Sequence, residues 1–312
     1  MENFNELLKK YADFIVRVGV NPQPGQTLII NCCLKAAPLA RLCVRSAYEA
    51  GARDVLVNWS DNDVSRSRME LGSEEALSDF KSWQLRRYLD YAESEGGVCV
   101  LHIHADDPEV YAGLDGAKIS RVNAGQRKFM APWREYTMND RVQWSIAAMP
   151  SAPWAKKMFP ELDTDAAIEK LWQLIFDVCR VTGGDPVGEW KAHLDRLMTL
   201  RDKMNAFDLE SVHFQSSNGT DLTVGLADKA RWESAGSKNE KGVDFLPNIP
   251  TEEVFTAPHK DKVNGVVYGT KPYVFNGQLI KGFHVTFQDG KVVEHGAEEG
   301  AELLGQLLDT DA

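Results

Sequence analysis

Two adjacent glutamates, Glu252 and Glu253, lie in the stretch PNIPTEEVFTAP. Pro247 and Pro250 fix two backbone torsions just before the pair, and the Val-Phe-Thr that follows favours a β-strand. The two carboxylates therefore occupy a pre-oriented entry to a strand. A metal ligand needs such an orientation, whereas a solvated glutamate does not. Proline-flanked strand starts are also common in β domains, so the stretch allows two interpretations, a metal ligand or an ordinary strand entry.

A second candidate site is the stretch LHIHADDP. His102 and His104 lie two residues apart in a predicted strand, so both rings face the same side, and Asp106 and Asp107 follow directly. Such a pair of imidazoles can hold a metal ion when a third ligand comes from elsewhere. The alternative, which the permissive spacing favours, is that the polar strand end packs its histidines against a neighbouring helix. Three further histidines lie in helical or strand patterns and are expected to be structural: His193, His213 and His284.

The aromatic segment PSAPWAKKMFPELDTD allows two interpretations. Its Trp and Phe side chains could shape a pocket for apolar groups, or they could belong to a buried connection between domains. The sequence contains neither a GxGxxG turn nor a GxxxxGK[ST] loop, so it offers no phosphate-binding loop. GxSxG, HExxH and the protein kinase signatures are also missing. The commonest nucleotide-binding, hydrolase and transferase sites are therefore excluded.

The composition is that of a globular protein with two domains. The chain has 312 residues, of which 43% are hydrophobic, which is ample for real cores. Lys and Arg total 35 against 46 Asp and Glu, which gives a formal net charge of -11. A charge of this sign opposes binding to a phosphate backbone, so we expect no nucleic acid partner.

The sequence also indicates where the protein works. Polar residues interrupt the apolar positions of the first twenty residues or so, unlike a secretion signal, and no stretch resembles a membrane span. The cysteines lie in apolar runs, as reduced thiols do, and form no CxxC pair that would indicate a zinc ribbon. They are Cys32, Cys33, Cys43, Cys99 and Cys179. We therefore expect a cytoplasmic protein without a membrane partner.

Strands and helices alternate in the N-terminal region. Spacings of three and four predict a first helix that ends near Gly19, and apolar runs predict strands in QTLIINCC, DVLVNW, GVCVLHIHA and VQWSIAAM. One helix is predicted across SEEALSDFKSWQLRRYLDYAESEG and another across GAKISRVNAGQRKFMAPWREYTM. Strands joined by helices of this length must lie parallel. We expect an α/β domain with a parallel sheet, followed by a helical connection, over residues 1–207.

Hairpin signals dominate from about Leu209 onward. Asn218-Gly219, Asn276-Gly277 and Asp289-Gly290 each stand between strand-like runs, and such pairs favour two-residue β-turns. A helical pattern, EEGAELLGQLLDTDA, ends the chain. Residues 208–312 are therefore expected to form a mainly antiparallel β (α+β) domain.

Several long stretches resemble one enzyme family. The chain is similar to the thermophilic metalloaminopeptidases, which include aminopeptidases T, S and II. The resemblance rests, in chain order, on GVNPQPGQTLII, GARDVLV, PSAPWAKKMFP, NIPTEEVFTAP, KDKVNGVVYGTKP and NGQLIKGFHVTFQDGKVV. It covers most of the chain.

The resemblance implies a function and a set of partners. It implies a cytoplasmic homodimer that releases N-terminal residues from peptides with two divalent ions, for which Zn, Co and Mn are all suitable. The metal-binding glutamate of the family motif falls on Glu253, with Glu252 as the fallback. Glu252 is also a candidate contributor to catalysis.

The resemblance also implies that ligands are missing. In that family a second Glu, two His and an Asp lie beyond the helix that here ends in LLDTDA. We therefore expect the β-rich domain to be incomplete and the chain to be a truncated form that is inactive alone. One alternative is a non-catalytic scaffold or dimerisation homologue that lacks most metal ligands. Another is a metal-binding protein that uses His102 and His104.

Overall fold

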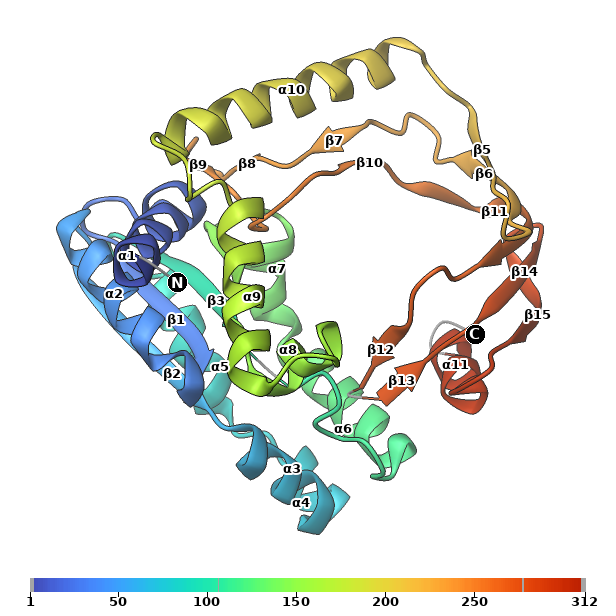
Figure 1. The fold of residues 1–312 in the computed structure, drawn as a ribbon, viewed down its shortest axis with the longest axis horizontal. Helices are drawn as coiled ribbons and strands as arrows, with labels where there is room; N and C mark the ends of the chain where they lie inside the picture. Colours follow the sequence, from blue (N-terminus) through green and yellow to red (C-terminus); the bar gives the residue numbers. More distant parts are fainter. Residues whose placement is uncertain (1–2, 106, 277, 310–312) are drawn as a thin grey trace. The chain divides into compact units, whose positions relative to one another are not determined.

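The computed structural model describes residues 3–105, 107–276 and 278–309 (Figure 1). The chain forms two compact units, each built from separate segments. Unit 1 comprises Met1–Asp107, Arg121–Asp195 and Ala235–Glu252, and unit 2 comprises Pro108–Ser120, Arg196–Ser234 and Glu253–Ala312. The expected domain boundary between residues 207 and 208 stays a prediction.

Unit 1 contains a four-stranded sheet in which all neighbouring strands are parallel. The strands in spatial order are β2 (Asp54–Ser60), β1 (Thr27–Cys33), β3 (Val98–His104) and β4 (Trp144–Ala148). They correspond to the four predicted strands, and the parallel order confirms the expected α/β class. The continuous apolar character of β1 and β3 follows from helices on both faces of the sheet.

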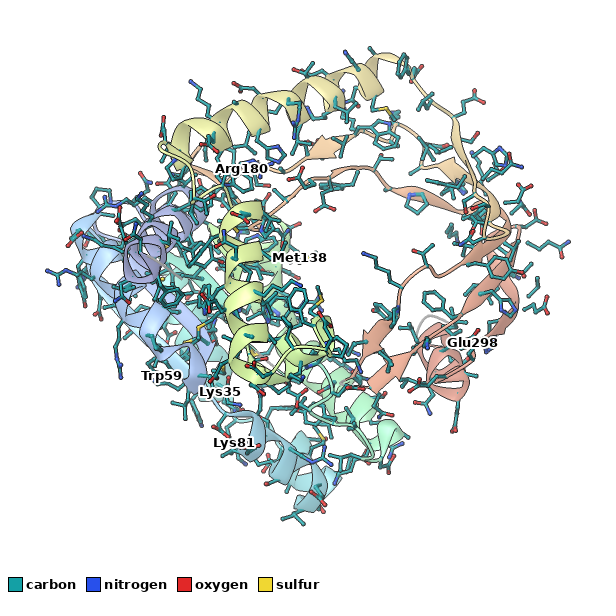
Figure 2. The ribbon with its side chains drawn as sticks, in the orientation of Figure 1. Lys35, Trp59, Lys81, Met138, Arg180 and Glu298 are labelled. Carbon is teal, nitrogen blue, oxygen red and sulfur yellow. The ribbon has the colours of Figure 1, made fainter. Side chains whose placement is uncertain are left out.

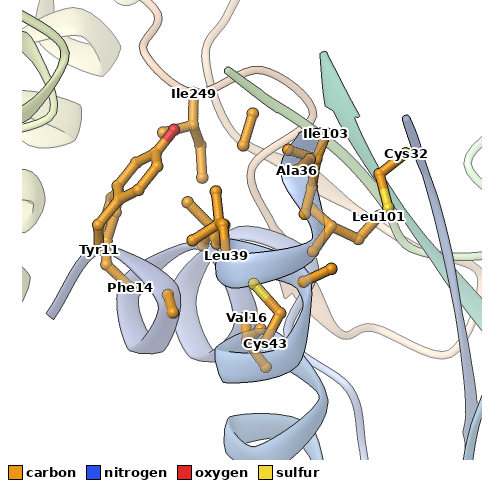
Figure 3. Close-up of a cluster of buried hydrophobic side chains, with 14 of the residues drawn as sticks. Tyr11, Phe14, Val16, Cys32, Ala36, Leu39, Cys43, Leu101, Ile103 and Ile249 are labelled. Carbon is orange, nitrogen blue, oxygen red and sulfur yellow. The ribbon is translucent and has the colours of Figure 1, made fainter. Parts of the chain in front are cut away.

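Successive residues of the central strands enter two different cores. Leu28, Ile30 and Leu101 contribute to the first core, whereas Ile29 and Val100 contribute to the second. This alternation is the period-two pattern of a strand that is covered on both faces. The first core is closed by α1 (Phe4–Phe14), α2 (Ala37–Glu49) and α9 (Thr164–Val178), and part of it is drawn in Figure 3. The second core is closed by α5 (Ser82–Ala92) and α7 (Ala131–Met138).

Two predicted helices are each divided in the structure. The helix expected from residue 73 to 96 is split into α4 (Glu74–Ser78) and α5, since Asp79 after α4 has φ -81° and ψ 72°, outside the helical region. The helix expected from residue 116 to 138 is split into α6 (Gly116–Phe129) and α7, since Pro132 lies in the first turn of α7, the position that proline favours.

The remaining elements of unit 1 are short. They are a π-helical turn at Ile15–Val20 that continues α1, a 3₁₀ turn at Leu34–Ala36, α3 (Asn62–Leu71), α8 (Ala152–Met158), and the paired strands β8 (Ser237–Lys238) and β9 (Asp244–Phe245). The aromatic segment around α8 forms a connection, because Trp154 and Phe159 pack against the first core. Ser151 caps α8 by accepting a hydrogen bond from the Trp154 backbone N–H at 3.3 Å.

Unit 2 is built on an antiparallel sheet. Its five strands in spatial order are β15 (Lys291–Gly296), β14 (His284–Gln288), β11 (Pro258–Tyr268), β6 (Asp221–Leu226) and β5 (Ser211–Gln215). Two small ladders accompany it: β7 (Glu233–Ser234) with β10 (Val254–Phe255), and β12 (Tyr273–Phe275) with β13 (Gln278–Ile280). This arrangement confirms the expected antiparallel β class.

Two of the predicted turns join strands as expected. Asn218-Gly219 lies between β5 and β6, and Asp289-Gly290 lies between β14 and β15. Gly290 has φ +78°, and a Cβ there would lie 1.6 Å from the Lys260 carbonyl oxygen, so the turn requires glycine. The third turn joins β12 to β13 and includes Asn276 at φ 50°; its Gly277 lies outside the described residues.

Two further helices complete the chain. The long helix α10 (Pro186–Ala206) belongs partly to each unit, and α11 (Ala301–Leu308) buries Leu303 and Leu304 with Ile280 of β13. The end of the chain, residues 310–312, lies outside the described residues. Over the described ranges, no helix combines the length and the apolar character that a membrane span requires.

Candidate metal-binding site

The segment that precedes the two glutamates is anchored in unit 1. The Ile146 N–H of β4 donates to the Pro247 carbonyl at 2.8 Å, and the Ile249 N–H donates to the Ile146 carbonyl at 2.9 Å. Residues 247–249 therefore lie parallel to β4 along its outer edge. The Ile249 side chain is buried in the first core (Figure 3). Backbone pairing and burial thus fix this approach, in addition to the prolines noted in the sequence.

The Glu252 carboxylate is held by a buried histidine and an arginine of unit 1. Its Oε1 accepts a hydrogen bond from Arg180 Nη2 at 2.9 Å and lies 3.5 Å from His193 Nε2. His193 Nε2 also lies 2.8 Å from the Thr251 carbonyl oxygen, and its Nδ1 lies 3.2 Å from Arg180 Nη2. A neutral ring that donates from Nε2 and accepts at Nδ1 satisfies these contacts. We call Arg180, His193 and Glu252 the Glu252 clamp.

Arg180, which is labelled in Figure 2, is held by its own backbone and by a neighbouring ring. It follows α9 with φ 58°, a left-handed conformation that is uncommon for a side chain of this size. Its guanidinium carbon lies 4.9 Å from the centre of the Trp190 ring, a cation–π distance. Trp190 is fully buried and donates its indole N–H to the Cys179 carbonyl at 2.6 Å. The guanidinium that pairs with Glu252 therefore packs against a buried side chain of unit 1.

Glu253 differs from its neighbour. It is exposed, and within the described residues its carboxylate has neither a hydrogen bond nor an ion pair. Its carbonyl oxygen accepts from Ser234 Oγ at 3.5 Å in unit 2, and the next two residues pair with β7. The structure thus fixes the backbone around Glu253 and leaves its carboxylate available to a ligand.

The second candidate site is a pair of stacked histidines at the end of β3. The ring centres of His102 and His104 lie 6.5 Å apart with 16° between their planes, so the rings do face the same side. Burial lowers the pKa of His102 to about 4, and repulsion from His104 adds to this shift. Asp106 lies outside the described residues. A mostly buried imidazole that resists protonation fits the structural interpretation of this pair.

The described residues do not complete a metal centre. No group of three or more His, Cys, Asp and Glu side chains within residues 3–105, 107–276 and 278–309 is arranged to hold an ion. A catalytic zinc takes about three protein ligands. The Glu253 carboxylate alone supplies fewer donors than such a site needs.

No pattern in the sequence points to the Glu252 clamp. His193 was expected to be structural, which agrees with its burial, but Arg180 was not singled out. Arg180 and Glu252 are 72 residues apart, and no local pattern links them. A lone basic residue after a helix is the only signal, and it is common at helix ends.

Comparisons with known proteins agree with one another. A family described as thermophilic metalloprotease (M29) matches residues 4–312. Aminopeptidase 2 of Geobacillus stearothermophilus is 41% identical over 311 residues, which are 100% of this chain and 75% of that protein. Aminopeptidase T of Thermus aquaticus is 37% identical over 311 residues, 100% of this chain and 76% of that protein. The solved structure of wild-type AmpT from Thermus thermophilus has a TM-score of 0.89 and 33% identity, and the match covers 99% of this chain and 75% of that chain.

Proposed function

The chain belongs to the thermophilic metalloprotease (M29) family, and on this basis we propose that it is a metal-dependent aminopeptidase that releases N-terminal residues from peptides. The similar proteins named above are aminopeptidases, and similarity extends over the whole chain. The parallel α/β unit and the antiparallel β unit occur together in the matched structure of AmpT. The substrate class is therefore peptides with a free N-terminus.

The observation that carries the site assignment is the contrast between two neighbouring carboxylates. Glu252 is engaged by Arg180 at 2.9 Å, whereas Glu253 has no side-chain partner within the described residues. The guanidinium that pairs with Glu252 Oε1 is positively charged and would repel a cation bound beside it, so Glu252 is the less suitable ligand of the two. This supports Glu253 as the metal ligand.

The same contrast bears on Glu252. The sequence makes Glu252 a candidate contributor to catalysis, but its Oε1 is already engaged by the guanidinium of Arg180. Its contacts favour a positioning role: the clamp holds residues 251 and 252, and the β7–β10 ladder holds residues 254 and 255. Because the backbone is fixed on both sides, the Glu253 side chain loses less conformational entropy when it binds an ion.

The proposed cofactors are two divalent ions, for which Zn, Co and Mn are suitable because carboxylate and imidazole ligands bind all three. Two bound ions supply charge stabilisation and orientation of the substrate. Since no group of three or more possible ligands lies together in the described residues, the contribution that we assign to them is the placement of Glu253. The chain spans about three quarters of the length of its aminopeptidase relatives.

Assembly and location are part of the same proposal. We expect a homodimer in the cytoplasm. All five cysteines are free and buried, which supports a reducing compartment. Light scattering of the protein expressed from its complete gene, at micromolar concentration, should give twice the mass of one chain, and a monomer mass would contradict the dimer.

Matched variants test the function. In the protein expressed from its complete gene and supplied with Zn, Co or Mn, Glu253→Gln should lower kcat/KM for an aminoacyl anilide about a hundredfold or more. It should also weaken metal binding measured by calorimetry, while circular dichroism stays unchanged because the amide keeps the volume. Glu252→Gln should lower kcat/KM less than about tenfold.

Two results would decide against parts of the proposal. Equal losses in the two variants would contradict the separate roles of Glu252 and Glu253. If the wild-type protein bound no metal and hydrolysed no anilide, the alternative of a non-catalytic scaffold or dimerisation homologue would hold.

A further inference from the structure

Unit 1 contains a polar cavity that the proposed aminopeptidase site does not use. It has a volume of about 310 Å³ and lies where three strands of the sheet begin. Gln26 directly precedes β1, Gly97 precedes β3 and Gln143 precedes β4. We call it the amide cavity, because the side chains of Gln26, Gln143 and Asn239 line it and all three are at most 5% exposed.

The acceptors of these three carboxamides are already used. Gln26 and Gln143 pair reciprocally, each Nε2 donating to the other's Oε1 at 3.0 Å. Gln26 Oε1 also accepts from the Gln23 N–H at 2.7 Å, and Gln143 Oε1 also accepts from Asn239 Nδ2 at 2.9 Å. Asn239 Oδ1 accepts from two backbone N–H groups of its own turn, both at 2.9 Å.

The donors, in contrast, are not all used. Each amide nitrogen carries two hydrogens. Gln143 Nε2 donates its second hydrogen to the Asn21 carbonyl oxygen at 3.1 Å. Within the described residues, however, Gln26 Nε2 and Asn239 Nδ2 each have a single acceptor. Among these three carboxamides, two N–H donors therefore remain without an acceptor, whereas every carbonyl oxygen is already used. This surplus favours a ligand group that only accepts hydrogen bonds, such as a carboxylate.

Charged side chains at the same cavity favour a ligand with two opposite charges. Arg141 and Glu240 pair with each other at 3.2 Å, and Arg141 stacks on Tyr136 at 4.1 Å. Lys241 and Glu93 also line the cavity, but in the described part of the chain neither has an ion-pair partner, and they do not pair with each other. The Lys241 Nζ lies close to Gly97, since a Cβ placed on Gly97 would be in contact with it at 3.7 Å.

We propose that the amide cavity binds a free α-amino acid. Its carboxylate accepts from the spare amide hydrogens and faces Lys241, its ammonium faces Glu93, and an apolar side chain lies against Val98, Val142 and Tyr136. The inference does not depend on the proposed peptidase activity, although an amino acid is the class of product that such an activity releases. A site whose lining does not include Glu253 would make the protein sensitive to free amino acids.

Calorimetric titration with L-leucine tests the proposal. L-leucine should bind, while L-leucinol, which lacks the carboxylate and has no amide bond to hydrolyse, and N-acetyl-L-leucine, which lacks the ammonium, should each bind about tenfold more weakly because one charge stays unpaired. The absence of leucine binding at millimolar concentration, or equal affinity for all three compounds, would overturn it.

Variants locate the binding. Lys241→Ala and Glu93→Ala remove exposed charges, so the fold should persist, and each should weaken leucine binding about fivefold. The matched controls Lys191→Ala and Glu95→Ala, also exposed residues of unit 1 but outside the cavity, should leave it unchanged. Glu253→Gln should leave it unchanged too. Leucine binding that responds to Glu253→Gln but not to Lys241→Ala would place the amino acid at the proposed active site and refute the amide cavity.

Discussion

The two units bury their apolar side chains to different extents. In unit 1 the central strands have helices on both faces, and both cores include fully buried side chains such as Tyr11 and Phe176. In unit 2 the cluster beneath α11 is small, and aromatic residues of the sheet remain exposed, Phe214 at 51% and Tyr268 at 39%. A sheet that is covered on two faces removes more apolar area from water than a sheet covered on one. We therefore expect unit 1 to have the larger free energy of unfolding of the two units.

A pair of aromatic substitutions tests this comparison with the largest expected effect. Phe176→Ala in the first core should lower the free energy of unfolding of unit 1 by about 4 kcal/mol, because it leaves a cavity among close-packed rings. Phe214→Ala on the exposed sheet of unit 2 should cost below about 1 kcal/mol. Chemical denaturation measures both values. Similar losses would break the contrast between the units.

Acid should also weaken unit 1 through His102. Burial lowers the pKa of His102 to about 4, from an ordinary value of 6.5, so the unfolded chain binds the proton more readily. Stability is therefore full above pH 6.5 and falls as pH decreases towards 4, by about 3 kcal/mol at most for this group.

The matched variants for this effect are His102→Asn and His213→Asn. His102→Asn should remove that part of the acid sensitivity, measured as the difference from wild type in denaturation experiments at neutral and acidic pH. His213→Asn in unit 2, where the side chain is 54% exposed, serves as the control and should follow the wild type. An unchanged pH profile in His102→Asn would show that His102 is not the sensitive group.

The smallest effect concerns the segment where the chain leaves unit 1. Arg180→Gln removes the 2.9 Å ion pair with Glu252 and should cost about 1 kcal/mol, since that carboxylate is largely exposed. Hydrogen exchange in residues 247–255 should nevertheless increase clearly, because the clamp also holds the Thr251 carbonyl.

A surface ion pair of similar length in unit 2 provides the control. Arg201 Nη2 lies 2.7 Å from Asp202 Oδ1, and Arg201→Gln should leave exchange in residues 247–255 unchanged. Equal exchange in the two variants would mean that the Glu252 clamp does not hold this segment.

Local patterns in the sequence were enough to predict the class of both halves. Branched apolar runs separated by helical patterns gave the parallel sheet, and Asn218-Gly219 and Asp289-Gly290 gave two antiparallel connections. Helix ends were harder, because a break such as the one at Met130 depends on tertiary packing as well as on Pro132.

The site was predictable only in part. The pair Glu252 and Glu253 could be found from its proline-flanked position and from family resemblance. The difference between the two residues could not, because it depends on Arg180 and His193, which are 72 and 59 residues away from Glu252 in sequence and meet it only in the folded chain. The amide cavity could not be predicted for the same reason, because residues 26, 143 and 239 share no local pattern.

The division into units has a consequence for how this chain can be cut. The backbone passes between the units after Asp107, Ser120, Asp195, Ser234 and Glu252. A single break at any of these positions leaves segments of at least one unit on both products, so neither protease nicking nor a shortened gene can release both units intact. Transfer of one unit to another protein would require several new chain connections at once, because each unit consists of three separate segments. The two units are therefore expected to be inherited together.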